Sequence, residues 1–393
     1  MKLNRRIKEA SINLAIVIAT LVICLLLFEA YFAVFNPQTA RPNAVAARVW
    51  GFYKYDELLG WRNKPGAAGV FSTPEFSTSV TINSKGLRDK EREYKKPAGI
   101  KRVIVLGDSF TWGWGVEEKD KFTEILNNKL PSNYEVINMG VSGYGTDQEL
   151  LTLEREGLKY NPDLVIVAFH PQTDLEDNIS AIRYSYPKPL FVLSANNTLS
   201  LTNVPVPKKE DWLKSWDTGE EIIKNDGFLA KLKNFMSEHS HTYLFFSRVV
   251  ASNPILLKLF QKIGLIEELP TGTLGYISGY TLKQHDWDLT KALFREIDTV
   301  AKNNGARTLI FIVRYKYTDI RLNEALDKIT AELVDFGKQN DLMVLDYLPT
   351  FIKYTGVREQ LYFKHDGHWN ADGHRTAAEA IYEKLKEEGL IQK

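Results

Sequence analysis

The sequence predicts an α/β fold built around a parallel β-sheet. Short apolar runs rich in β-branched residues occur at residues 103–106, 164–169 and 308–313. Runs of this kind are typical of strands buried on both faces, as in parallel sheets. Segments with helical spacing of apolar residues separate these runs, and this alternation is typical of βαβ units with right-handed crossovers.

Further segments continue the pattern over most of the chain. Two more strands are expected, at residues 134–138 and 343–346. The spacing of apolar residues predicts five helices, at residues 117–130, 147–158, 289–303, 321–340 and 371–388. The main domain is therefore expected at residues 101–393.

Two regions depart from this alternation. Residues 36–100 are rich in Pro, Gly, Ser and aromatic residues, which indicates a spacer and a small β extension with one or two short strands within residues 71–87. The segment at about 178–288 is irregular except for an aromatic part, residues 235–260, that has a helical pattern. Structureless loops of this length are uncommon, so we interpret the segment as an insertion with its own helices that caps the site.

The amino terminus has the pattern of a membrane anchor. Residues 1–12 carry four basic residues, and residues 13–35 are almost wholly apolar, with Glu29 as their one charge. This length suffices to cross a bilayer, and the preceding basic residues predict a cytoplasmic tail. The main domain would then lie on the periplasmic side of a bacterial inner membrane. A cleaved signal peptide is the alternative, but small residues (Ala44-Val45-Ala46) follow only well past the apolar segment.

Composition excludes several other classes. The 50 Lys and Arg residues nearly balance the 49 Asp and Glu residues, giving a net charge of +1, so no nucleic-acid partner is indicated. The single cysteine, Cys24, lies within the apolar segment, which leaves the rest of the chain without disulfides or cysteine metal ligands. We expect no cofactor and no metal.

A serine stands where the first predicted strand ends. Gly107-Asp108-Ser109-Phe110 follows residues 103–106 directly. Open α/β sheets bind ligands at the carboxyl ends of their strands, and a helix amino terminus there favours an oxyanion. Ser109 is therefore a candidate nucleophile, although Asp or Ser at such a turn also commonly serves as a helix N-cap.

A candidate base lies near the other end of the chain. Asp366 and His368 are two positions apart in a loop before the last predicted helix, so an extended backbone points both side chains the same way. A serine hydroxyl needs a base that takes its proton and a carboxylate that orients this base. An alternative is a metal cluster, because imidazoles and carboxylates suit zinc. Its members would be His365, Asp366, His368 and His374.

Three motifs carry a resemblance to a known family. GDSF at residues 107–110, NMGVSGYGT at residues 138–146 and DGHWN at residues 366–370 resemble those of the SGNH (GDSL-type) hydrolase superfamily. The resemblance covers about residues 101–178 and 289–393. It implies a flavodoxin-like three-layer α/β/α fold and esterase, deacetylase or acyltransferase activity. By position it implies Ser109 as nucleophile, His368 as base and the N–H groups of Ser109 and Gly143 as an oxyanion hole.

Two features differ from the common family pattern. The family has Asn-Asp in its third block, where this chain has Thr173-Asp174, so Thr173 is the candidate for the side-chain oxyanion donor. Asp-x-His followed by Trp replaces the commoner Asp-x-x-His. That form is similar to the membrane-associated branch that O-acetylates bacterial exopolysaccharides. The candidate substrate-lining residues are Asp108, Trp112, Trp114, Asp174 and Trp369.

The sequence thus predicts a membrane-anchored serine esterase or acyltransferase that acts on O-acyl groups of a carbohydrate. A transferase outside the cytoplasm would need a membrane protein that supplies the acyl group. Two alternatives are a catalytically silent glycan-binding or scaffold protein and a lipid esterase. At the site, Trp112 and Trp114 could instead pack against a neighbouring loop, and Thr173 and Asp174 could cap a helix.

Overall fold

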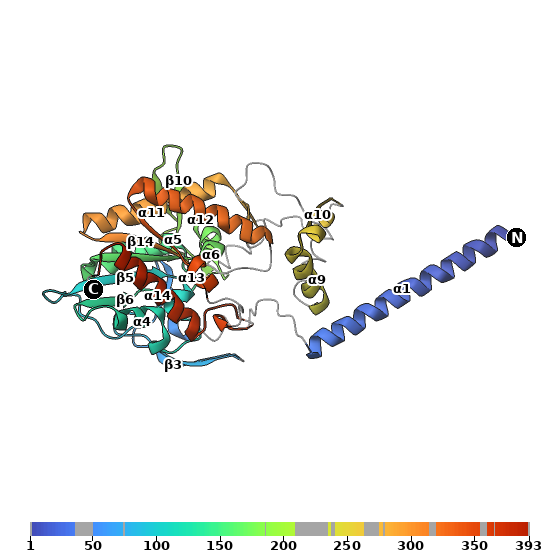
Figure 1. Cartoon of the computed structure of the whole chain (residues 1–393), viewed down its shortest axis with the longest axis horizontal. Helices are drawn as coiled ribbons and strands as arrows, with labels where there is room; N and C mark the ends of the chain where they lie inside the picture. The colour runs from blue at the N-terminus through green and yellow to red at the C-terminus, as the bar shows by residue number, and fades with distance from the viewer. Residues whose placement is uncertain are drawn as a thin grey trace. The chain divides into compact units, whose positions relative to one another are not determined.

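The computed structural model divides the chain into two units. It describes residues 2–35, 50–73, 75–184, 186–208, 235–236, 240–262, 275–277, 280–313, 320–353, 360–364 and 366–391. The smaller unit holds the amino-terminal helix and two helices of the insertion, and the larger unit holds the sheet (Figure 1). His365, most of the spacer and Ala44-Val45-Ala46 lie outside the described residues.

Five parallel strands form the central sheet of the larger unit, in the order β15-β14-β7-β5-β6. In chain order, this is the 2-1-3-4-5 arrangement of flavodoxin-like folds. The predicted fold class is confirmed, and each of the five predicted strands is present. They are β5 (Lys101–Gly107), β6 (Tyr134–Asn138), β7 (Leu164–Phe169), β14 (Arg307–Ile312) and β15 (Met343–Asp346).

Alternate residues of the strands enter two separate cores. Ile104 and Leu106 of β5 belong to the core beneath α5 (Thr146–Arg155), α11 (Gln284–Asn303) and α12 (Ile320–Asn340). Val103 and Val105 belong to the core beneath α4 (Phe122–Lys129), α13 (Leu348–Lys353) and α14 (Ala371–Glu387). Helices therefore cover both faces of the sheet, which gives three layers (Figure 1). Burial on both faces explains the continuous apolar runs.

The helix after β5 differs from the expectation for residues 117–130. A short helix, α3 (Ser109–Trp112), begins at Ser109 itself and ends at Gly113, whose φ of 88° is left-handed. A 3₁₀ turn, η2 (Glu118–Asp120), and the extended Lys121 precede α4. Glycine adopts a left-handed φ without strain, so Gly113 divides the segment into two helices. A second short helix that the pattern did not reveal, α6 (Pro171–Asn178), follows β7.

The amino-terminal extension forms two antiparallel hairpins on the larger unit. Of the one or two short strands expected within residues 71–87, β4 (Ser77–Thr81) lies in that range, and its partner β3 (Ala68–Ser72) begins before it. The other pair, β1 (Tyr53–Asp56) and β2 (Gly60–Asn63), was not predicted. Trp61, Phe71 and Val80 of these strands are buried in the core under α5 and α11, so the extension is part of the folded domain.

The described part of the insertion belongs to both units. In the larger unit it forms β8 (Ile182–Arg183) with β9 (Tyr186–Pro187), β10 (Leu190–Leu193) with β11 (Leu199–Thr202), and β12 (Gly275–Ile277) with β13 (Tyr280–Leu282). A fully buried ion pair between Lys188 and Asp147 joins this part to α5. The aromatic part forms α9 (His241–Ser252) and α10 (Pro254–Lys262), which pack in the smaller unit with α1 (Lys2–Phe35).

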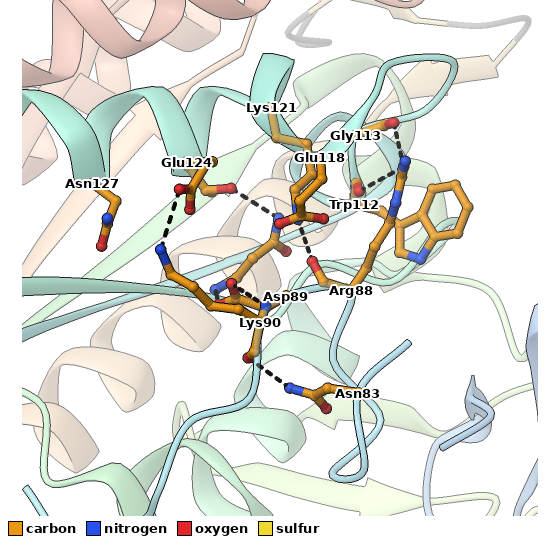
Figure 2. A network of polar contacts seen from close by, with 12 residues as sticks. Asn83, Arg88, Asp89, Lys90, Trp112, Gly113, Glu118, Lys121, Glu124 and Asn127 are labelled. Carbon is orange, nitrogen blue, oxygen red and sulfur yellow. Dashed lines mark hydrogen bonds and ion pairs between the residues drawn. The ribbon is translucent and has the colours of Figure 1, made fainter. Parts of the chain in front are cut away.

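A buried arginine joins the extension to the loop that follows α3. Arg88 is 1% exposed and donates hydrogen bonds to the carbonyl groups of Trp112 (3.1 Å), Gly113 (2.5 Å) and Val116 (2.6 Å). Its guanidinium also lies over the indole of Trp112, 4.4 Å from the ring centroid (Figure 2). Lys121, fully buried, donates to the carbonyl of Arg88 and pairs with Glu118 at 2.8 Å. These contacts fix the course of residues 112–116.

Removing the guanidinium should destabilise the larger unit strongly. In Arg88→Met, the carbonyl groups of Trp112 and Val116 lose their donor, whereas that of Gly113 keeps the N–H of Val116 at 3.3 Å. Each buried unsatisfied group costs about 1–3 kcal/mol, so we expect the free energy of unfolding to fall by at least ~2 kcal/mol, measured by urea denaturation in detergent. Arg375→Met, which removes an exposed ion pair with Asp372, serves as the control and should change stability by less than ~0.5 kcal/mol. Equal effects of the two substitutions would contradict this role of Arg88.

Candidate active site

The structure brings Ser109, His368 and Asp366 into one chain of hydrogen bonds. The Oγ of Ser109 lies 2.7 Å from Nε2 of His368, although 259 positions separate the two residues. The other ring nitrogen of His368, Nδ1, bonds to Oδ1 of Asp366. Nucleophile, base and carboxylate are therefore joined in the order that serine hydrolysis requires.

The nucleophile is positioned by the end of β5 and the start of α3. Asp108 is the N-cap of α3, and its Oδ1 accepts a hydrogen bond from the N–H of Phe110 (2.9 Å). Ser109 is therefore the first residue of the helix, at the carboxyl edge of the sheet. β5 and β7 are neighbours here, and the order of connection reverses between them, which is where such folds bind ligands.

The candidate base and its carboxylate are held by residues from two other parts of the chain. The indole N–H of Trp114 donates to Oδ2 of Asp366 (3.1 Å), and its ring stacks on His368, with 5.1 Å between the centroids. The backbone N–H of Asp366 donates to Glu75 at the β3–β4 turn (2.7 Å). Burial acts to raise the pKa of Asp366, but the charge of His368 and hydrogen bonds from His368 and Trp114 outweigh it and lower the pKa. Asp366 is therefore an anion suited to orienting an imidazole.

Gly143 lies on a loop tied to the end of β5. The N–H of Val141 donates to the carbonyl of Gly107 (3.0 Å), which places the loop beside the turn that carries Ser109. Gly143 has a φ of 78°, and a Cβ there would lie 2.5 Å from the ring of Tyr184. Within the described part of the chain, neither the N–H of Ser109 nor that of Gly143 donates to a protein acceptor. Both groups are therefore open to an oxyanion.

Two aromatic residues of the extension hold the same loop. Tyr53 donates its hydroxyl to Oγ of Ser142 (2.8 Å), and the indole N–H of Trp61 donates to the carbonyl of Ser142 (3.1 Å). The hydroxyl of Tyr144 donates in turn to the carbonyl of Trp61 (2.5 Å). Hairpin β1–β2 thus supports the loop of Gly143, as β3–β4 supports that of Asp366.

Thr173 and Asp174 lie in the first turns of α6. The hydroxyl of Thr173 is 3.0 Å from Nδ1 of His170 and 3.2 Å from Oδ1 of Asp174. Asp174 accepts a hydrogen bond from the N–H of His170, the N-cap of α6, at 2.7 Å. The bonds of Asp174 are thus those of a helix cap, whereas Thr173 stays half-buried with its hydroxyl engaged by its own helix.

The structure corrects most of the candidate substrate-lining residues. Trp112, Trp369 and Asp174 are 0% exposed, and Asp108 is 4% exposed, so none of these side chains lines an open groove. Trp112 packs under Arg88 and donates to Asn63 (3.1 Å), and Trp369 is part of the core under α14. Burial of the large apolar rings of Trp112 and Trp369 stabilises the fold. Trp114 alone of the five is half-buried, at the base itself.

The described residues do not support the metal cluster that includes His374. That imidazole is 1% exposed on α14, and its Nδ1 accepts a hydrogen bond from the N–H of Phe122 (3.2 Å). Burial lowers its pKa to about 3, so it is a neutral acceptor in the core. A separate acidic group, Asp89, Glu118 and Glu124, has atoms within 4.8 Å of one another, but Lys121 and Lys90 pair with it (Figure 2).

Comparison with known proteins points to one family. Residues 105–169 match the model of the GDSL-like Lipase/Acylhydrolase family. This part of the chain is therefore similar to that family. The matched residues run from β5 to the end of β7 and include Ser109 and Gly143. Among curated proteins, none matches the sequence.

Solved structures similar to the chain include three from bacteria. A member of the lipolytic protein G-D-S-L family from Veillonella parvula has 12% identity, covers 72% of this chain and 97% of its own, and gives a TM-score of 0.35. A GDSL-like lipase from Bacteroides thetaiotaomicron has 13% identity, covers 75% of this chain and 92% of its own, and gives a TM-score of 0.36. A catalytic mutant of an acetylxylan esterase from Geobacillus stearothermophilus has 12% identity, covers 74% of this chain and 96% of its own, and gives a TM-score of 0.38.

The sequence alone did not reveal two residues at the candidate site. Glu75 receives the N–H of Asp366, and nothing in its hairpin sequence indicates a partner 291 positions away. Tyr184 lies against Gly143 and is 52% exposed, with a left-handed φ of 53° that is strained for a tyrosine. A non-glycine residue with such a backbone can be detected only in a structure.

A group of buried carboxyls lies close to Asp108, the residue before Ser109. Glu149 on α5 is 1% exposed, and within the described residues neither of its carboxyl oxygens has a hydrogen-bond partner. Burial raises the pKa of Glu149 well above its usual range, and the charges of Asp108 and Asp147 raise it further. Burial likewise raises the pKa of Asp174, together with the charges of Glu149 and Asp108. Both carboxyls therefore hold their protons to a higher pH than exposed carboxyls do.

The raised pKa of Glu149 predicts that stability falls as the pH rises above about 4.3. The folded state holds this proton more tightly than the unfolded state, whose glutamate pKa is about 4.3. Its contribution is complete below that value and is lost as the pH rises through the folded pKa. We expect Glu149→Gln, a neutral isostere, to reduce this decline in the melting temperature as the pH is raised from about 4. Glu383→Gln, on an exposed side chain, is the control, and equal pH profiles for both variants would contradict the prediction.

Proposed function

We propose that the protein is a membrane-anchored serine esterase or acyltransferase that acts on O-acyl groups of a carbohydrate outside the cytoplasm. The contact of 2.7 Å between Ser109 and His368 is the observation that carries the proposal. It is within the distance over which a base can take a hydroxyl proton. The match to the GDSL-like Lipase/Acylhydrolase family supports the same chemistry.

In this mechanism, Ser109 attacks the ester carbonyl while Nε2 of His368 accepts the hydroxyl proton. Asp366 holds the imidazole by Nδ1 and stabilises the imidazolium that forms. The N–H groups of Ser109 and Gly143 receive the oxyanion of the tetrahedral intermediate. His368 then gives its proton to the departing alcohol, which leaves the acyl group on Ser109. Water or a sugar hydroxyl takes the acyl group in the second half of the reaction.

A carbohydrate substrate is favoured by two features. The Asp-x-His-Trp pattern resembles the branch that modifies bacterial exopolysaccharides, and Tyr184 offers a half-exposed ring beside Gly143. Aromatic rings with one apolar face and one polar end suit sugar rings, which present both kinds of surface. Tyr184 would then hold the glycan next to the oxyanion hole.

Anchoring is proposed from the amino-terminal helix. Residues Ser11–Phe35 of α1 form an apolar helical segment of 25 residues, long enough to cross a bilayer. The basic residues that precede it favour a larger unit on the periplasmic side of a bacterial inner membrane. Cytoplasmic acyl donors do not reach that side, so the transferase form requires a membrane protein that delivers the acyl group. The hydrolase form needs no such partner.

Covalent labelling tests the nucleophile. We expect a fluorophosphonate probe to label the wild-type full chain and not the Ser109→Ala variant, because the probe reacts covalently with an activated serine. Circular dichroism confirms that the variant is folded. If the folded wild-type protein is not labelled, the proposed enzymatic function is wrong and a scaffold protein is favoured. A preference for long-chain over acetyl p-nitrophenyl esters would favour a lipid esterase.

Trp114→Phe tests the support of the carboxylate. The phenyl ring keeps the stacking on His368 but cannot donate to Asp366. A hydrogen bond to a charged group contributes about 1.5–3 kcal/mol, so we expect kcat/KM to fall about 10- to 100-fold. The pKa of Asp366 should rise, which moves the acid limb of the pH–rate profile upward. In an Asp366→Asn background, Trp114→Phe should have little further effect, and full additivity would refute the coupling.

A further inference from the structure

In the smaller unit, α9 packs against the apolar helix α1, and α10 packs against α9. The ring of Phe245 on α9 stacks on Phe32 of α1, with 4.6 Å between the centroids, and Phe246 meets Phe28 edge-on at 6.2 Å. Asn253 joins the two helices, and its side chain accepts the N–H groups of Ile255 (3.0 Å) and Leu256 (3.1 Å) at the start of α10. These contacts form a hairpin on the carboxyl-terminal end of α1.

The one charge of the apolar segment is satisfied by this hairpin. The carboxylate of Glu29 accepts hydrogen bonds from the N–H groups of His241 (2.7 Å) and Thr242 (3.0 Å), and from Oγ of Ser240 (2.8 Å). These groups are the N-cap and first turn of α9, whose unpaired N–H groups and positive dipole end favour an anion. An unpaired charge near hydrocarbon is costly, so α9 removes the penalty of Glu29.

Helix geometry places this contact at the boundary of a bilayer. Glu29 follows Ser11, the start of the apolar segment, by 18 residues (29 − 11), which correspond to about 27 Å of α-helix. The hydrocarbon core of a bilayer is about 30 Å thick. With Ser11 near the inner boundary, Glu29 and the first turn of α9 lie near the outer one.

The hairpin carries several apolar side chains that are largely exposed. Ile255 is 77% exposed, Leu259 49%, Phe246 46% and Val249 36%. The two residues on α10 are four positions apart, and the two on α9 are three apart, so each pair lies on one side of its helix. The exposed lysines Lys258 and Lys262 accompany the pair on α10, and lysines of this kind reach lipid headgroups while their stems lie on apolar surface.

We propose that α9 and α10 form a second membrane contact, with their exposed apolar side chains in the interfacial layer of the outer leaflet. The partner is the lipid surface itself, in continuity with the spanning helix against which the hairpin packs. This inference rests on the proposed anchoring by α1. It also favours an uncleaved helix over a signal peptide, because removal of α1 would expose the first turn of α9 and the ring of Phe245. The hairpin fixes a part of the insertion at the membrane.

Site-specific fluorescence quenching tests the contact in the full chain. Single cysteines replace Ile255, Leu259, Leu21 or Lys338 in a Cys24→Ser background and carry an NBD label. The proteins are reconstituted into phosphatidylethanolamine/phosphatidylglycerol vesicles that contain doxyl-labelled lipids. Leu21 in the apolar helix is the positive control, and Lys338, with a side chain 72% exposed on α12, is the negative control. The substituted positions are exposed, and circular dichroism verifies that each variant is folded.

We expect lipids with the doxyl group near the headgroup to quench the labels at positions 255 and 259 strongly and the label at position 338 weakly. Lipids with the doxyl group deep in the chain should quench the label at position 21 most. If the label at position 21 is quenched while positions 255 and 259 match position 338, the hairpin contact is wrong and the anchor stands. If the label at position 21 is not quenched, the anchor fails and the hairpin contact with it.

Discussion

The whole site depends on a hydrogen bond between two groups that the chain supplies from opposite ends. Ser109 follows the first strand of the sheet, and His368 precedes the last helix, yet their side chains meet at 2.7 Å. The strand order makes this possible, because β5 lies in the interior of the sheet with β7 beside it. Loops that leave the carboxyl ends of such strands share one edge, so the register of a buried sheet fixes the distance between base and nucleophile.

Support for that edge comes mainly from residues before the sheet begins. Hairpin β1–β2 binds the loop of Gly143 through Tyr53 and Trp61, and the β3–β4 turn supplies Glu75 to the backbone of Asp366. Arg88 fixes the loop that carries Trp114, whose indole reaches the carboxylate of Asp366. Catalytic groups are effective only when their surroundings hold them in a narrow range of geometry, and here the amino-terminal extension provides that rigidity.

The parts of the structure that local patterns encode could be predicted from the sequence, and the parts that depend on tertiary partners could not. Continuous apolar runs identified the three inner strands, β5, β7 and β14, because burial on both faces leaves no polar position. Trp112 and Trp114, two positions apart, show the limit of prediction from local sequence. Trp112 is buried under Arg88, while Trp114 contacts His368. Only the course of the loop after Gly113 separates them. Hairpin β1–β2 was missed because its strands are four residues each, too short for a clear alternation.

The position of Glu75 sets a limit on how the chain can be shortened for biochemical work. A fragment that starts at the first strand of the sheet would retain Ser109, His368 and Asp366 but would lose the acceptor for the Asp366 backbone and the clamp of Arg88. Such a fragment would contain the three hydrogen-bonded side chains of the candidate site but would hold them loosely. A fragment without α1 that keeps this geometry should therefore begin before Trp50, the first residue of the short η1 turn (Trp50–Phe52) that leads into β1.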